Sequence, residues 1–233
     1  MWLGDGIKPA RFDDRRFPAD EAQRPTMPDR HHATPSPRHP TITSMLLPVS
    51  KLSDHPVAES ALLDLCRPFV TNGFQPGCTI VQPDQIPFPE DQLLVHHEHM
   101  TEVLEKHHGS PVEVHVMNEV LEGDIYTRKI ALTPRDQPSK IVELGIARLD
   151  LRYLSPDVKD EILAKQLPLG AVLIKHNVLR RVKPRWFMQF ADGGPVVSLF
   201  GDCPHKGVAH GRIGTIYCDE EPAIEVLEIV LNA

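Results

Sequence analysis

The chain has 233 residues, which is room for one domain with a sizeable core and a tail but short for two full domains. Its 25 Lys and Arg against 32 Asp and Glu give a formal net charge of -7, so the basic surplus that a nucleic-acid-binding protein uses on phosphates is missing. No stretch holds the roughly 20 apolar residues of a membrane-spanning helix, and the first residues lack the basic start and apolar run of an export signal. The cysteines form no CxxC pair and are too sparse for a disulfide scaffold: Cys66, Cys78, Cys203 and Cys218. We therefore expect a soluble cytoplasmic protein with reduced thiols and no nucleic-acid or membrane partner.

The first 44 residues differ in composition from the rest of the chain. The chain has 23 prolines, and Pro9, Pro18, Pro25, Pro28, Pro35, Pro37 and Pro40 all fall in this segment, which has few aliphatic side chains. Such a segment buries too little apolar area to offset the entropy of ordering it. We expect residues 1–44 to be a disordered tail and residues 45–233 to form the domain. Met45, which opens Met-Leu-Leu-Pro, is a candidate for the physiological start.

Helical patterns come first in the predicted domain. Residues 58–66 (AESALLDLC) predict a short helix that Pro68 ends. In the run 92–107 we expect helix in the second half, with Thr101 as the cap of its free amides and Gly109 as its stop.

Beyond Gly109 the apolar period changes to two, which is typical of strands. Ser155 and Pro156 predict the start of a helix through residue 165, followed by an apolar run at 167–174. The order of elements predicts an α+β domain with a mostly antiparallel sheet flanked by helices. The strands are expected at 111–119, 126–132, 141–153 with a bend near Gly145, 182–190, 212–218, and 223–231 with both faces buried.

Two charged residues stand out because they share a strand face with apolar side chains. Arg128 is in phase with Tyr126, Ile130 and Leu132, and Glu228 is in phase with Ile224, Val226 and Val230. An unpaired buried charge costs several kcal/mol or more, so each should have a partner or a ligand. The simplest interpretation is that Arg128 and Glu228 pair with each other or lie on half-wet faces. Glu225 also lies between apolar neighbours, and phase alone does not choose between the two glutamates.

Four segments in this order resemble the chorismate pyruvate-lyase family: His99-Met100-Thr101 with Glu105 following, Tyr126-Thr127-Arg128, Pro168-Leu169-Gly170, and Glu228 before Ile229-Val230-Leu231. The resemblance implies a chorismate lyase-like fold with a buried ligand pocket. It further implies that Met100 opens a helix, that Arg128 and Glu228 face each other across the pocket, and that Leu169 and Gly170 form part of its wall. The sequence departs from the family pattern in two respects. Residues 176–210 are longer than the family suggests, and a further strand arginine has no clear counterpart, with Ile146 near its position and Arg148 as a candidate substitute.

The activity that the resemblance implies is the release of pyruvate from chorismate to give 4-hydroxybenzoate, with no cofactor or metal. Arg128 would fix a ring carboxylate, because its planar fork matches two carboxylate oxygens. Glu228 would supply a proton, since a carboxyl group in an apolar pocket holds its proton at neutral pH. Met100 and Leu169 would form a dry wall, and Gly170 would permit close backbone approach. The pathway that the product feeds and the oligomeric state stay open.

Two other classes of function compete with a lyase. A non-catalytic module that binds an aromatic carboxylate would use the same fold, and it differs from an enzyme in that chorismate would be bound and not consumed. A metal site would draw on Cys203, His205, His210 and Cys218, or on the histidines near residue 99, but their spacing matches no zinc pattern. We therefore expect a small-molecule partner and no bound metal.

Overall fold

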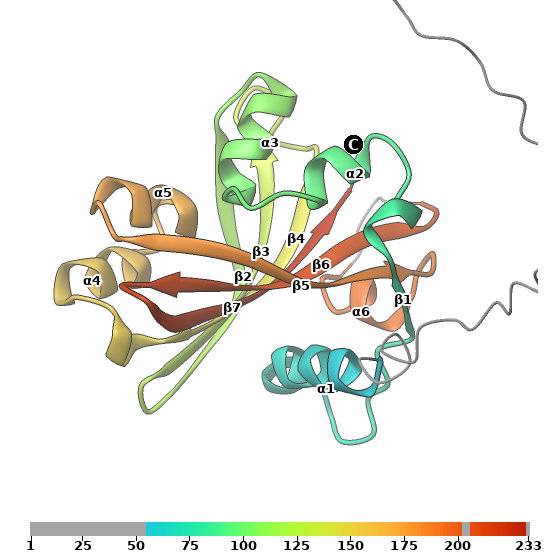
Figure 1. Ribbon diagram of the computed structural model, residues 1–233, viewed down its shortest axis with the longest axis horizontal. Coiled ribbons are helices and arrows are strands. Elements are labelled where there is room, and N and C mark those ends of the chain that lie inside the picture. Colours follow the sequence, from blue (N-terminus) through green and yellow to red (C-terminus); the bar gives the residue numbers. More distant parts are fainter. Residues whose placement is uncertain (1–54, 202–205, 232–233) are drawn as a thin grey trace, which may run out of the picture. The chain divides into compact units, whose positions relative to one another are not determined.

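The computed structural model describes residues 55–201 and 206–231 (Figure 1). The predicted tail, residues 1–44, and the candidate start Met45 lie outside these ranges. Among the described residues, no helix is long and apolar enough to cross a membrane.

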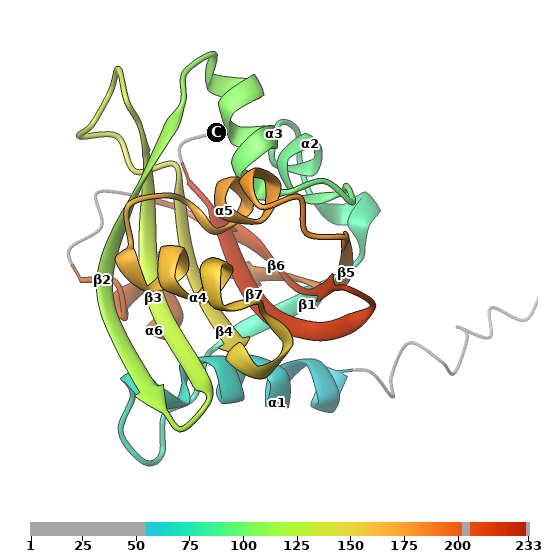
Figure 2. The ribbon, with the colours of Figure 1, turned by 90° about the vertical axis from the view of Figure 1, so that its left-hand side faces the viewer.

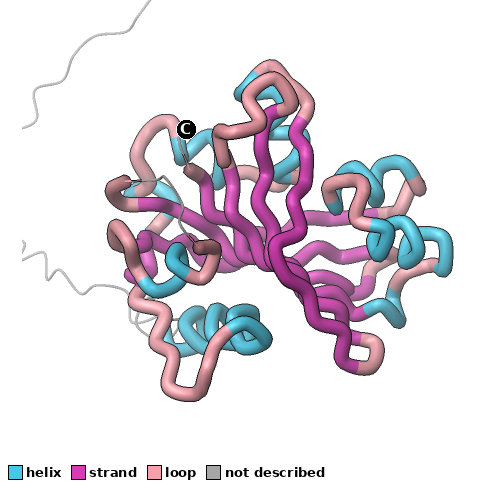
Figure 3. The backbone as a smooth tube through the Cα atoms, turned by 180° about the vertical axis from the view of Figure 1, so that it is seen from behind, coloured by secondary structure: helices cyan, strands magenta, loops and turns pink. Residues whose placement is uncertain are grey.

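The centre of the described chain is one antiparallel sheet of seven strands in the order β1-β5-β6-β7-β4-β3-β2. Figure 3 shows the twist of this sheet. The prediction of an α+β domain with an antiparallel sheet is confirmed. The strands are β1 (Cys78–Val81), β2 (Val112–Glu122), β3 (Ile125–Pro134), β4 (Glu143–Asp150), β5 (Arg180–Phe190), β6 (Ala209–Cys218) and β7 (Glu221–Val230).

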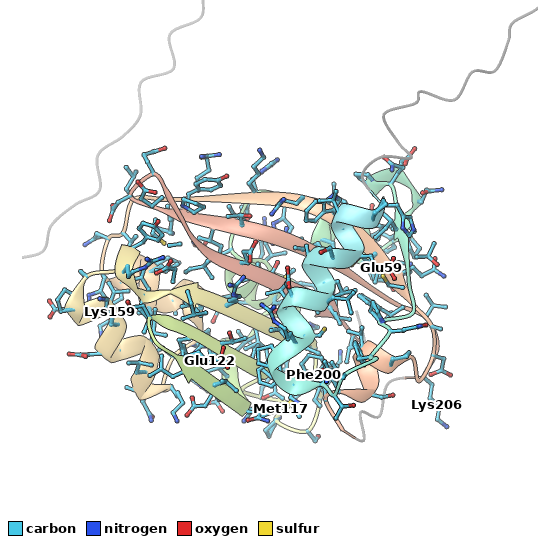
Figure 4. All side chains as sticks on the ribbon, turned by 90° about the horizontal axis from the view of Figure 1, so that it is seen from below. Glu59, Met117, Glu122, Lys159, Phe200 and Lys206 are labelled. Carbon is cyan, nitrogen blue, oxygen red and sulfur yellow. The ribbon has the colours of Figure 1, made fainter. Side chains whose placement is uncertain are left out.

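Helices pack on both faces of this sheet (Figure 2). On one face, α1 and α6 pack against side chains such as Leu144 and Ile229, and Figure 4 shows α1 crossing that face. On the other face lie α2 and α3 at one end and α4 and α5 at the other. The helices are α1 (His55–Cys66), α2 (Glu90–Leu94), α3 (Met100–His108), α4 (Pro156–Ala164), α5 (Leu169–Lys175) and α6 (Pro195–Ser198).

Several local predictions are corrected by the structure. Thr101 is the second residue of α3 and not its cap, because the helix begins at Met100, two residues earlier than predicted, and His99 occupies the cap position. Ser155 does cap α4, but its side chain makes no capping hydrogen bond. The strand predicted to reach residue 153 ends at Asp150, where a 3-10 turn begins, and its pairing runs through Gly145 without a bulge.

Other predictions hold. Gly109 ends α3 in the left-handed conformation, with φ of 65°. Strand β7 is buried along most of its length, as predicted. The stretch predicted to differ from the family, residues 176–210, contributes the long strand β5 to the sheet, between β1 and β6.

The core on the α3 and α5 side divides into two apolar clusters. One holds Leu104 and Leu132 beneath α2 and α3, and the other holds Leu149 and Val172 beneath α4 and α5. The space between these two clusters contains the pocket described next.

Candidate functional site

A pocket opens between the sheet and the N-terminal ends of α3 and α5. Its cavity volume is about 60 Å³, and the empty space is about 500 Å³ when open solvent at the mouth is included. All the site residues predicted from the sequence line it: Met100, Arg128, Leu169, Gly170 and Glu228. They come from α3, β3, α5 and β7, so the fold brings together four segments that are distant in sequence.

Arg128 is a buried cation whose hydrogen-bonding capacity is partly unused. Its side chain is 2% exposed, and its Nε and Nη1 have no hydrogen-bond partner within the described residues. Burial lowers the pKa of its guanidinium, while nearby Tyr126 and Glu119 oppose this effect. Arginine keeps its charge in proteins all the same. A positive charge with free N–H groups beside a pocket is a site for an anion.

Glu228 does not pair with Arg128. Its Oε2 accepts a hydrogen bond of 2.6 Å from Nε of Arg212, a fully buried residue of β6. Arg212 Nη1 also donates to the carbonyl oxygens of Leu94 and His96, at 2.8 and 3.0 Å. The loop after α2 therefore fixes Arg212, and Arg212 fixes Glu228 against the pocket. The charge of Glu228 is thereby compensated inside the protein.

Glu143 is a second carboxyl group in the pocket, and the sequence analysis missed it. It is 3% exposed, and its Oε2 has no hydrogen-bond partner among the residues described. Burial, reinforced by the negative charge of Glu228, raises the pKa of Glu143 well above its usual range, against a smaller opposing effect of Arg212. Burial thus favours the neutral, protonated form of the Glu143 carboxyl group.

The wall formed by α3 and α5 depends on a close helix contact. A Cβ on Gly170 would lie 3.1 Å from Oγ1 of Thr101 and 3.2 Å from Cβ of His99, so α5 could not approach α3 this closely with a larger residue. His99 Nε2 accepts a hydrogen bond of 2.7 Å from Nε of Arg180. Burial and the charge of Arg180 lower the pKa of His99 to about 4, so its ring is neutral at pH 7. A neutral, apolar wall thus stands opposite the charged strands.

The remaining sequence candidates lie elsewhere. Glu225 is on the opposite face of β7, where it pairs with Arg148 at 3.3 Å and Arg185 at 3.6 Å. Arg148 therefore does not reach the pocket as a substitute for a missing arginine. Ile146 packs with its side chain in the cluster beneath α1. The structure thus resolves the choice between Glu225 and Glu228 in favour of Glu228.

Arg212 and Glu143 carry the same signal in the sequence that singled out Arg128. Arg212 is in phase with Ile216 and Cys218 along β6, and Glu143 is in phase with Gly145, Ala147 and Leu149 along β4. Their roles depend on which strands are neighbours: β6 pairs with β7 so that Arg212 lies opposite Glu228.

No group of three or more metal-ligating side chains occurs in the part of the chain that the structure describes. Of the cysteine and histidine residues considered for a metal, Cys203 and His205 lie outside that part. His210 lies near Glu90 at 3.9 Å and Cys218 is buried as a free thiol.

No protein-family model and no curated protein sequence matches the chain. Among solved structures it is similar to PhnF from Mycobacterium smegmatis, with 13% identity and a TM-score of 0.41, over 57% of this chain and 63% of that chain. It is also similar to the effector domain of PhnF from the same organism, with 13% identity and a TM-score of 0.39, over 58% of this chain and 89% of that chain. The chain thus spans less than two thirds of the length of the whole PhnF structure.

Proposed function

We propose that the pocket binds a small ring carboxylate and that the protein releases pyruvate from chorismate to give 4-hydroxybenzoate, without a cofactor. The observation that carries the proposal is the buried guanidinium of Arg128, whose Nε and Nη1 lack protein partners beside an apolar pocket. A carboxylate placed there would form charge-assisted hydrogen bonds in a dry environment, where such bonds are strong.

The distance between Arg128 and Glu228 suits a ring substituted at both ends. Arg128 lies opposite Ala147, which lies opposite Val226, so Arg128 and Glu228 are two strands and two residues apart on one face. Strand spacings of about 4.8 Å and rises of about 3.3 Å per residue give a Cα separation of about 12 Å. A ring that contacts both side chains would lie over β4, the strand between β3 and β7.

The reaction requires positioning and proton transfer but no redox step. The ether bond to the enolpyruvyl group breaks, the ring loses one hydrogen and becomes aromatic, and enolpyruvate converts to pyruvate. Arg128 would hold the ring carboxylate, and the apolar wall of Met100 and Leu169 would exclude water. We assign proton transfer at the other end of the ring to the carboxyl groups there, of which Glu228 is fixed by Arg212.

A second candidate function is binding without catalysis, and the charge balance of the pocket favours it. Arg212 is matched by Glu228 and burial favours the neutral form of Glu143, so Arg128 is the charged strand residue of the pocket that has no ion pair among the described residues. One positive charge suits a monocarboxylate such as 4-hydroxybenzoate better than a dicarboxylate such as chorismate.

The experiment that decides is incubation of the purified full chain with chorismate, with 4-hydroxybenzoate and pyruvate followed together by chromatography. The lyase proposal predicts equal amounts of both products, a sharp loss of turnover in Glu228→Gln, and weaker binding in Arg128→Ala. Arg148→Ala, which changes an arginine on the opposite face of the sheet, is the matched control and should behave as the wild type. Binding of 4-hydroxybenzoate without turnover, lost in Arg128→Ala, would establish the binding module instead. Neither turnover nor binding would overturn both.

A further inference from the structure

We propose that Glu143 is the proton donor of this pocket and that Glu228 is the matching proton acceptor. The inference rests on the proposed function and goes beyond it, because neither the sequence pattern nor the resemblance assigned Glu143 any role. It reverses the expectation that Glu228 supplies the proton.

The position of Glu143 follows from the register of the central strands. Glu143 lies opposite Val230, and Glu228 lies opposite Gly145, so the two carboxyl groups are diagonal neighbours on the pocket face of β4 and β7. Diagonal side chains are within reach of one another when they are long. The glycine between them leaves the necessary space, since a Cβ on Gly145 would lie 3.3 Å from Oε1 of Glu143. The carboxyl group of Glu143 thus leans over Gly145 toward the pocket.

Among the described residues no ion pair or hydrogen bond compensates a negative charge on Glu143, and the charge of Arg212 offsets the effect of burial only in part. Arg212 directs Nε to Glu228 and Nη1 to the carbonyls of Leu94 and His96. The other titratable side chains near this region are Arg128 from β3, His210 from β6, and His96 and His99 from the loop before α3. Within the described residues none of them makes a hydrogen bond to Glu143. Burial raises the pKa of Glu143 for this reason. Its Oε2 has no partner among the described side chains and is free to meet a ligand oxygen.

The two carboxyl groups together balance the proposed reaction. The proton of Glu143 passes to the ether oxygen as the bond between that oxygen and the ring carbon breaks and its electron pair leaves with enolpyruvate. The carboxylate of Glu228 takes the ring proton, and the electron pair of that C–H bond completes the aromatic ring. Exchange with water returns a proton to Glu143 and removes one from Glu228, so the pair is restored after each turnover. Pairs of carboxyl groups in enzymes commonly divide the roles of acid and base in this way, because their environments give them different pKa values.

The direct test is infrared difference spectroscopy of the full chain, which detects the C=O band of a neutral carboxylic acid. We expect this band at pH 7 in the wild type, a shift of the band when 4-hydroxybenzoate is added, and its loss in Glu143→Gln. Glu228→Gln should keep the band, and Glu225→Gln, a change on the opposite face, is the matched control. Absence of the band in the wild type, its persistence in Glu143→Gln, or no response to the ligand would overturn the proposal.

Kinetics give an independent readout. In Glu143→Gln we expect kcat to fall by about 100-fold or more while the Kd for 4-hydroxybenzoate changes less than about threefold, because the neutral amide replaces the neutral acid without supplying a proton. Wild-type kcat in this variant would contradict the donor role. Glu143→Asp, which shortens the acid but keeps its proton, should retain part of the activity, and circular dichroism of both variants excludes loss of folding as the cause. If the wild type turns over no chorismate, the lyase proposal fails, whereas the infrared band still decides whether Glu143 holds the proton and offers it to the ligand.

Discussion

The two buried arginines of the pocket differ in what surrounds them, and this difference predicts opposite effects of the same substitution. Arg212 is held by a carboxylate and two carbonyl oxygens and leaves only Nη2 without a partner among the described residues, whereas Arg128 has neither Nε nor Nη1 paired there. A buried charge without a partner lowers stability. Removal of one member of a buried ion pair therefore lowers stability too, because the other member is left buried and unpaired. If Arg128 serves a ligand, as proposed, we expect its buried charge to lower the stability of the unliganded protein.

We predict that Arg128→Met raises the free energy of unfolding, by about 1 kcal/mol or more, while Arg212→Met lowers it by about 3–5 kcal/mol because Glu228 loses its partner. Chemical denaturation at pH 7 in the absence of ligand measures both. Arg212→Met combined with Glu228→Leu should recover most of the loss, since the unpaired carboxylate is then removed. A loss of stability in Arg128→Met would indicate that Arg128 is structural.

The neutral ring of His99 predicts how stability depends on pH. Its pKa changes from 6.5 to about 4 on folding, so the contribution is complete above pH 6.5 and is lost as pH falls from 6.5 toward 4. The difference between these values corresponds to roughly 3 kcal/mol. We expect His99→Gln to flatten this decline between pH 7 and pH 4.5 in a series of urea titrations.

At the scale of elements, the contact between α3 and α5 sets the wall of the pocket. Gly170→Val would force Thr101 and His99 to move, because even a Cβ at this position lies 3.1–3.2 Å from them. We expect this variant to lose about 1–3 kcal/mol of stability and to bind 4-hydroxybenzoate more weakly than the wild type. Calorimetric titration and thermal unfolding measure the two effects. Ala171→Val, at the next and half-buried position of α5, is the control for the helix propensity of valine and should retain binding.

The length and pattern of each strand and helix decided whether it could be predicted from the sequence. Alternation of apolar residues located six of the strands within a few residues, because each strand packs at least one face on the core. Strand β1 and helix α2 were not predicted. Each has only four or five residues, which is too few for an apolar period to appear, and each lies in a proline-rich stretch. The same alternation marked Arg128 and Glu228 as unusual. Which charge meets which depends on strand pairing: Arg212 lies opposite Glu228 in the hairpin of β6 and β7, whereas Glu143 comes next to Glu228 only because β4 pairs with β7, which is distant in sequence. The sequence analysis missed both Arg212 and Glu143.

For the domain as a whole, the pocket exists only where the two apolar clusters on the α3 and α5 side are both in place. Its walls come from both clusters, with Met100 and Ile130 from one and Ala147 and Val226 from the other. An unfolded chain cannot assemble such a site, so a ligand of the pocket binds the folded state alone. Binding must therefore stabilise the entire domain against unfolding.

This linkage sets how much a ligand should raise the free energy of unfolding. At a free ligand concentration of 100 times its Kd, 4-hydroxybenzoate should add about 2.7 kcal/mol to the free energy of unfolding, which raises Tm by about 5–11 °C in a domain of this size. Differential scanning fluorimetry with increasing ligand measures the shift. Benzamide, a ring of similar size with no charge, should give a much smaller shift, because it offers no carboxylate to Arg128. Arg128→Met should unfold at a higher temperature than the wild type without ligand and should show no further increase with it. Equal shifts for the acid and the amide would mean that the pocket selects rings by their apolar surface and that the free N–H groups of Arg128 serve no ligand carboxylate.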